Sequence, residues 1–156
     1  MRKAILFITL LLTAVTAFQC NKKDNKIEDL KDTTVSKWTL NDKKFTASAA
    51  KWDSEWYFTG NDSGSALVAK DAASKFTIAA GFSKRPAVSG FYKICSSLNV
   101  PDGEVLLELT DGTYWYFSTT GGTADVEIVN GKIKITYSNI TLSNGNSKTS
   151  GVLVEQ

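Results

Sequence analysis

The sequence predicts an all-β domain, because its apolar residues recur with a period of two and turn dipeptides separate the runs. Segments such as ADVEIV and KIKITY alternate apolar and polar residues, which places every second side chain on one face of a strand. Asn-Gly, Asp-Gly and Asn-Asp pairs stand between such segments and favour tight antiparallel turns. We therefore expect about nine or ten short strands in an antiparallel β-sandwich, with a small up-and-down β-barrel as the alternative.

The first twenty residues carry the features of an export signal. Arg2 and Lys3 precede the uncharged, mostly apolar stretch 4–17, whose fourteen residues are short for a membrane span and typical of a signal peptide. Cys20 follows directly, and a run rich in lysine and aspartate comes after it. These residues resemble a lipoprotein signal peptide of the looser kind common in Bacteroidota, in which the cysteine becomes the first mature residue and is acylated.

This resemblance implies a signal peptide over 1–19, palmitate-type acyl chains on Cys20, and a lipid anchor in the cell envelope at the outer membrane. Both the periplasmic and the surface-facing side stay open. Gln19 replaces the usual small residue, and Val15-Thr16-Ala17 satisfies the small-x-small rule of ordinary signal peptidase, so plain secretion is the alternative. In that case Cys20 and Cys95 are free to form a disulfide.

Two segments follow the signal peptide. Residues 20–35 begin with the lipidated cysteine and are polar, with scattered charge and no aromatic residue, which is typical of a flexible tether. Residues 36–156 form the single all-β domain, a length that suits one hydrophobic core.

The first expected hairpin pairs Trp38 with Phe45 across Asn41-Asp42. The segment AKWDSEWYF (50–58) then alternates as a strand, with its tryptophans on one face and its charged residues on the other. Segments 75–83 and 91–95 add two further strands, and Pro101-Asp102-Gly103 reads as a turn.

A second hairpin is expected over 104–118, around Asp111-Gly112, with Leu109 facing Tyr114. Both of its faces are apolar, which is unusual for a hairpin with one side in water. One face carries Leu106, Trp115 and Phe117, with Glu108 beside them. If exposed, these four residues would form a stacking platform with one hydrogen-bond acceptor for a sugar, a peptide or a protein. The other interpretation is that they are core residues.

The clearest hairpin lies around Asn130-Gly131. This turn pairs Ile128 with Ile133 on one face and Glu127 with Lys134 on the other. The register is well specified, because a slip of one residue would separate both pairs. Beyond residue 137 the apolar phase changes, which predicts a bulge near 138–139, and TSGVLV then supplies a closing strand.

The opening WTLNDKKFTA and the later VNGKIKITYSNITL resemble small Bacteroidota lipoproteins of unknown function with β-sandwich domains. The resemblance covers most of the mature chain and implies the same fold class. It implies no functional residue, because it rests on turns and alternation and carries no site motif.

Composition narrows the functions. The chain contains no histidine, which removes Ser-His-Asp and Cys-His constellations and every zinc site with a histidine ligand. Without Arg2 and Lys3, basic and acidic residues balance, which argues against nucleic acid as a partner. No metal or cofactor site and no catalytic residue is expected.

We therefore expect a non-catalytic envelope module that binds a glycan, peptide or protein, anchored to the membrane by its lipid. A carrier of hydrophobic ligands in a small barrel is the alternative. A carboxylate-based hydrolase that uses Asp53 and Glu55 is the third class, and the least favoured.

Overall fold

The computed structural model describes residues 34–47, 49–57 and 63–156. The signal peptide over 1–19, Cys20 and most of the expected tether lie outside the described residues. Within the described part every regular element is a strand. The eleven strands are β1 (Ser36–Leu40), β2 (Lys43–Ala47), β3 (Ala50–Tyr57), β4 (Ser63–Lys70), β5 (Thr77–Phe82), β6 (Gly90–Ile94), β7 (Glu104–Thr110), β8 (Trp115–Phe117), β9 (Thr123–Val129), β10 (Lys132–Thr141) and β11 (Lys148–Val154).

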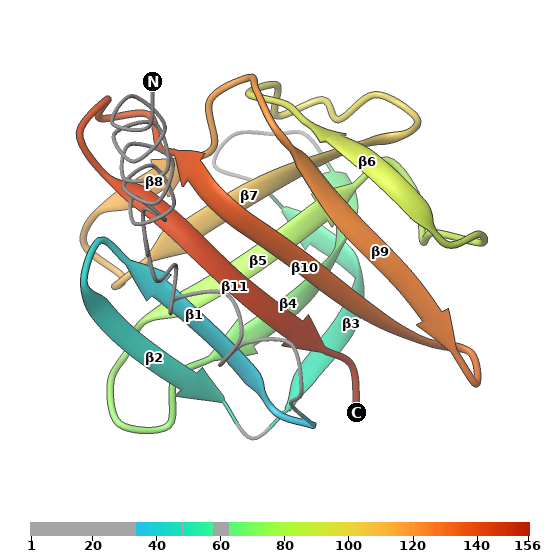
Figure 1. Cartoon of the computed structure of the whole chain (residues 1–156), viewed down its shortest axis with the longest axis horizontal. Coiled ribbons are helices and arrows are strands. Elements are labelled where there is room, and N and C mark those ends of the chain that lie inside the picture. The colour runs from blue at the N-terminus through green and yellow to red at the C-terminus, as the bar shows by residue number, and fades with distance from the viewer. Residues whose placement is uncertain (1–33, 48, 58–62) are drawn as a thin grey trace, which may run out of the picture.

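The strands form one sheet that curls into a nearly closed barrel. Their order is β2-β1-β11-β10-β9-β6-β7-β5-β4-β3, with β8 added to β7. Figure 1 shows one half of the sheet, from β2 to β9, crossing in front of the other half, which contains β3, β4, β5 and β7. The two ends approach each other where Glu155 bridges to Ala50 and where the Ala72 N–H donates to the Thr46 carbonyl at 3.1 Å. The all-β prediction is confirmed, and the sheet is nearly closed into a barrel, the architecture named as the alternative, but its strand order is not simply up-and-down and β6 pairs with β7 in parallel.

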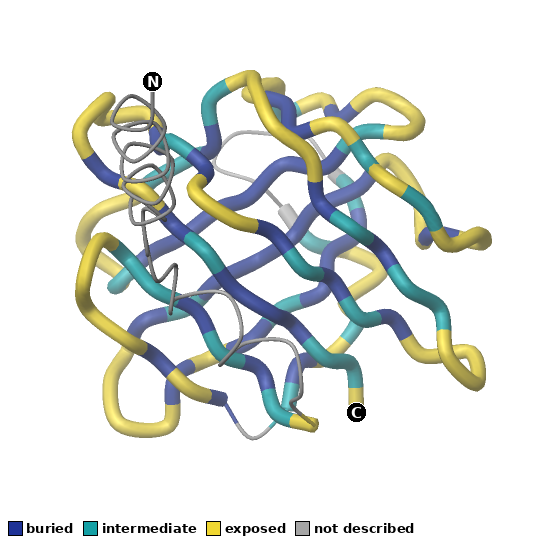
Figure 2. Tube along the Cα trace, viewed as in Figure 1, coloured by how far each residue is buried: buried dark blue, intermediate teal, exposed yellow. Residues whose placement is uncertain are grey.

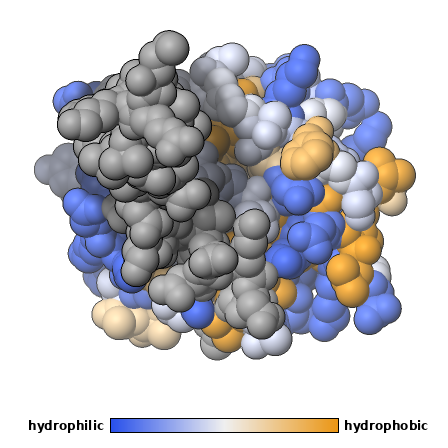
Figure 3. Space-filling model, viewed as in Figure 1, coloured by the Kyte–Doolittle hydropathy of each residue, from blue (hydrophilic) through white to orange (hydrophobic). Residues whose placement is uncertain are grey.

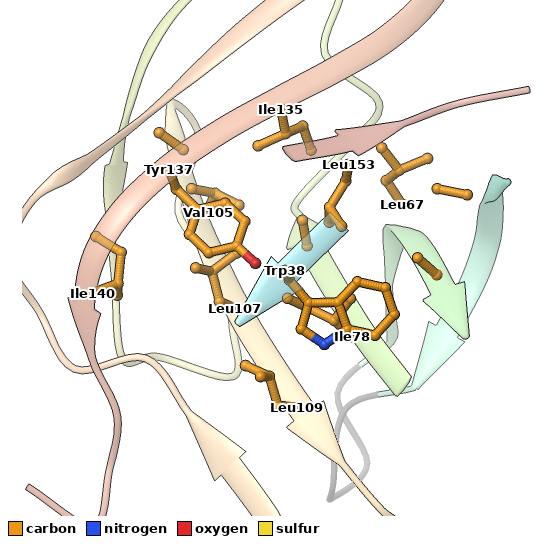
Figure 4. Packing of buried hydrophobic residues seen from close by; sticks show 14 of the residues in the cluster. Trp38, Leu67, Ile78, Val105, Leu107, Leu109, Ile135, Tyr137, Ile140 and Leu153 are labelled. Carbon is orange, nitrogen blue, oxygen red and sulfur yellow. The ribbon is translucent and has the colours of Figure 1, made fainter. Parts of the chain in front are cut away.

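Side chains fill the interior of this barrel. The tube in Figure 2 is buried along the middle of most strands and exposed mainly at the turns. In the close-up of Figure 4, aliphatic side chains from both halves of the sheet meet around Trp38 and Tyr137. Burial of each large side chain contributes about 1.5–3 kcal/mol. The largest fully buried ones include Trp38, Leu67, Ile78, Phe82, Leu107 and Ile135.

The predicted hairpins β1–β2 and β9–β10 are both confirmed. Trp38 pairs with Phe45, and their rings stack with centroids 5.6 Å apart. In the second hairpin Ile128 pairs with Ile133, and Glu127 opposes Lys134. The predicted bulge also exists, because the β10–β11 register shifts between Tyr137 and Ile140, around Asn139 with its φ of 56°.

The predicted alternation along β3 is wrong beyond Asp53. Trp52 pairs with Leu67 on the inner face, but the β3–β4 register then shifts, and Trp56 pairs with Gly64 on the outer face. The extra residue forms a bulge, in which the Asp53 carboxylate accepts the Glu55 N–H at 2.9 Å. The two tryptophans of this strand therefore lie on opposite sides of the sheet.

The register predicted for β7 and β8 is also wrong, by two residues. Leu109 pairs with Tyr116 and not with Tyr114. The cause is a longer turn, in which the Asp111 carboxylate accepts the N–H groups of Thr113 and Tyr114, both at 2.8 Å. A shift of two residues keeps every side chain on its predicted face, but it moves Tyr114 into the turn, where it is exposed.

Candidate functional site

A second, smaller core covers the outer face of β7. Leu106 is fully buried there and packs with Cys95 and Val100 from the segment between β6 and β7. Trp56 and Phe117 pack against this cluster from β3 and β8. Leu106 is therefore a core residue, as the second interpretation of the sequence held, and it does not belong to a surface platform.

Glu108 is buried in the same layer, with 1% of its surface exposed. The Trp56 Nε1–H donates to Glu108 Oε2 at 3.3 Å, while Oε1 has no hydrogen-bond partner within the described part of the chain. Burial raises the pKa of Glu108 to about 7, and the Trp56 hydrogen bond lowers it only in part. Glu108 is thus not available at the surface as a hydrogen-bond acceptor for a ligand.

The other two platform residues differ in exposure. Trp115 is 43% exposed, whereas Phe117 is half-buried against the second core. The structure therefore does not bring the four predicted site residues together on one surface. Trp115 instead stands beside the exposed Tyr114 at the turn between β7 and β8.

Other exposed apolar side chains are scattered. Val88, Phe91 and Val129 lie before β6, on β6 and at the end of β9. Figure 3 shows hydrophobic spots in this region of the surface, separated by hydrophilic ones. Single apolar side chains of this kind are ordinary on protein surfaces.

The structure does form a polar hollow at the end of the barrel where β3 and β5 finish and β4 begins. This mouth hollow has a volume of about 560 Å³. Its lining includes Trp52, Ser54, Glu55, Ser65, Lys84 and Arg85. An aromatic ring, hydroxyls and charged groups thus lie around one open concave surface.

Trp52 is held firmly at this hollow. The Arg85 guanidinium lies 4.9 Å from the centroid of its ring, and the Phe82 ring is 6.1 Å away. Arg85 in turn donates to both carboxylate oxygens of Glu155, at 2.9 and 2.7 Å, and to the Gly131 carbonyl at 2.9 Å. Burial raises the pKa of Glu155, but the hydrogen bonds from Arg85 and the Ile133 N–H outweigh it and hold this pKa below its ordinary value.

Ser65 carries an unsatisfied hydroxyl beneath the mouth hollow. The residue is 7% exposed and lines the hollow, yet its Oγ has no hydrogen-bond partner in the described part of the chain. A buried hydroxyl without a partner costs about 1–3 kcal/mol. Because this oxygen is itself buried, it lies beneath the surface of the hollow and is not exposed to a ligand bound there.

A second hollow adjoins the first on the outer side of β3. This flank hollow has a volume of about 550 Å³ and is lined by Lys51, Trp52, Asp53, Ser54, Val68 and Lys70. Trp52 and Ser54 line both hollows. The two hollows therefore meet at these residues of β3.

The two carboxylates considered for a hydrolase are divided between the hollows. Glu55 lines the mouth hollow and Asp53 the flank hollow, and the Asp53 carboxylate is engaged by the Glu55 N–H in the bulge. The Asp53 carboxylate thus stabilises the bulge in β3.

Trp52 and Ser65 were not among the predicted site residues. Trp52 looked like one of several equivalent core aromatics in an alternating strand, and the bulge that distinguishes it from Trp56 has no clear sequence signal. Ser65 follows a glycine and another serine, and its unpaired state appears only in three dimensions.

Comparison of the chain with protein-family models, with curated proteins and with solved structures finds no match. None of the described residues belongs to a helix long and apolar enough to cross a membrane.

Proposed function

We propose that this protein is a lipid-anchored component of the bacterial cell envelope whose barrel is a non-catalytic binding module for a glycan, peptide or protein. Its ligand binds at the mouth hollow. The observation that carries this proposal is the open hollow at the end of the barrel, where Trp52 lies beside Ser54, Glu55 and the charged groups of Lys84 and Arg85. An indole ring supplies an apolar surface, and the hydroxyl of the exposed Ser54 supplies a directional polar contact.

The surroundings of Trp52 support a binding role. Arg85 lies over one face of the ring and Phe82 lies near it, so the ring is held in one orientation before a ligand contacts the part that stays exposed. The interior of the barrel, by contrast, is occupied by the main core, which favours binding at the end of the barrel over carriage inside it.

Tryptophan fluorescence of the full-length protein tests the binding site. We expect a ligand from one of the three classes to change the emission of the wild type and to leave that of Trp52→Phe almost unchanged. Phe91→Ala, which alters an exposed aromatic residue on β6, is the matched control and should respond as the wild type does. A response that survives in Trp52→Phe and is lost in Trp115→Ala would place the ligand at the β7–β8 turn and refute the proposed site.

The anchor is tested separately, by feeding cells an alkyne-labelled fatty acid and detecting label on the protein. The wild type should incorporate the label and sediment with membranes, while Cys20→Ala should do neither, because Cys20 is the proposed acylation site. Release of unlabelled wild-type protein, cut before Phe18, would support plain secretion instead.

A further inference from the structure

We infer that the ligand is a neutral oligosaccharide of two or more sugar units, which crosses β3 with Trp52 between its two sugar sites. This inference rests on the proposed binding function and narrows it to one class of ligand and one path over the surface.

The shape of the site points to an elongated ligand. The mouth hollow and the flank hollow have similar volumes, about 560 and 550 Å³, and both are lined by Trp52 and Ser54. One compact ligand would occupy one of them. A chain that passes over β3 would occupy both, and it would contact Trp52 at its centre.

The chemistry of the lining matches sugar rings. A pyranose has an apolar C–H face, which packs on an aromatic ring, and a rim of hydroxyls that donate and accept. Ser54 offers a hydroxyl of the same double character, and Glu55 offers an acceptor. On the flank, Lys51 and Lys70 offer donors.

Charge at the site favours a neutral ligand. The positively charged residues that line the hollows are equal in number to the carboxylates that either line the hollows or form ion pairs with those residues. Arg85 is paired with Glu155 at 2.7 Å, and Lys84 with Asp102 at 2.9 Å. The four cations are Lys51, Lys70, Lys84 and Arg85, and the four carboxylates are Asp53, Glu55, Asp102 and Glu155. An anionic ligand would therefore find no net attraction.

The geometry of β3 disfavours an extended peptide. This strand is the last in the sheet order, so its outer edge is where a peptide could add as a further strand. The bulge between Asp53 and Trp56 interrupts that edge, and the Asp53 side chain already accepts the Glu55 N–H. Bulges and charged side chains on an edge strand block strand addition.

The test uses full-length protein in a detergent without a sugar headgroup. Its probes are gluco- and manno-oligosaccharides of one to six units, polygalacturonate as the anionic probe, and a tryptic digest of casein as the peptide probe. Affinities are measured by calorimetry alongside tryptophan fluorescence. We expect binding in the neutral series alone, with affinity rising about tenfold or more from the single sugar to the longer chains.

Two variants separate the two hollows. Glu55→Ala, at an exposed position that lines the mouth hollow alone, should weaken binding of every chain length about tenfold, because it removes a hydrogen-bond acceptor for the sugar hydroxyls. Lys51→Ala should reduce the increase in affinity from the single sugar to the longer chains and leave the affinity for the single sugar unchanged. Ser96→Ala and Lys93→Ala are matched controls at exposed positions outside both hollows and should bind as the wild type does.

Three results would overturn the inference. Equal affinity for all chain lengths would refute the path across β3. Binding of polygalacturonate or casein peptides alone, with a Trp52-dependent fluorescence change, would refute the neutral sugar and leave the proposed binding function intact. A complete lack of Trp52 response to every probe would contradict both.

Discussion

The Trp56 indole donates its Nε1–H to Glu108 Oε2 at 3.3 Å, beneath the loop that covers the outer face of the barrel. The bulge in β3 makes this contact, because it moves Trp56 to the outer face of the sheet. The contact gives Glu108 one hydrogen bond in an otherwise apolar layer, and its other oxygen has no partner among the described residues. A carboxyl group in such a place favours its neutral form.

Glu108 therefore makes stability depend on pH. Its pKa rises from an ordinary 4.5 to about 7 in the folded state, so the folded protein binds this proton more tightly than the unfolded chain does. The contribution is fully present below about pH 4.5, declines as the pH rises toward 7 and is lost above it, with a total of about 3 kcal/mol. Glu108→Gln keeps an acceptor for Trp56 and cannot ionise.

Urea unfolding of the wild type and Glu108→Gln at about pH 5, 7 and 9 measures this effect. The variant should gain stability relative to the wild type as the pH rises. A difference between the two proteins that stays constant across this range would show that Glu108 does not titrate in the predicted window.

Leu106 and Trp115 should respond in opposite ways to truncation. Leu106→Ala removes a fully buried side chain from the second core and should cost about 2–5 kcal/mol in the free energy of unfolding. Trp115→Ala removes a side chain that is 43% exposed and lies outside both clusters, so it should change stability by less than about 1 kcal/mol. Equal costs, measured by denaturant unfolding, would contradict the burial described above.

Gly151 should not tolerate a side chain. A Cβ at this position would lie 2.6 Å from Tyr137 Oη and 2.8 Å from Trp38 Cβ, the two side chains that approach each other in Figure 4. Gly151→Ala should therefore cost about 1–3 kcal/mol through overpacking. Gly90→Ala is the matched control, because nothing lies within 4 Å of its added Cβ. A Gly151→Ala protein as stable as the Gly90→Ala protein would refute the close packing over β11.

Arg85 should matter more than its neighbour Lys84. Arg85→Lys cannot keep both contacts to Glu155 together with the Gly131 contact, so it should cost about 1 kcal/mol and shift the Trp52 emission. Lys84→Ala breaks only a solvent-exposed pair with Asp102 and should leave stability almost unchanged. An unchanged Trp52 emission in Arg85→Lys would indicate that the guanidinium does not hold the ring.

The sequence predicted best where one face of a strand pair is apolar and the turn has two residues. The β9–β10 register followed directly from Asn130-Gly131, since any slip would place Ile133 in water. The barrel could not be distinguished from a sandwich, because closure depends on contacts between distant segments, such as that of Glu155 with Ala50. The errors at Trp56 and Tyr114 have one kind of cause, an aspartate side chain that accepts nearby backbone N–H groups and changes the local residue count.

The candidate site was harder to predict because it depends on contacts between separate segments of the chain. Leu106 and Glu108 alternate with inner-face leucines, so their pattern fits an exposed face as well as a second core. The segment between β6 and β7 covers this face of β7, and the alternation within β7 itself gives no sign of that cover. Arg85 lies over the Trp52 ring and pairs with Glu155, which is 70 residues further along the chain, so this arrangement does not show in the local sequence pattern.

The indole N–H spectrum of ¹⁵N-tryptophan-labelled protein tests the central claim most directly. The chain has four tryptophans, and each gives one signal that single Trp→Phe variants assign. On addition of neutral gluco- and manno-oligosaccharides we predict that the Trp52 signal moves, while that of Trp38, inside the barrel, reports an unchanged fold. Movement of the Trp115 signal with Trp52 unaffected would contradict the account and return the binding site to the β7–β8 turn.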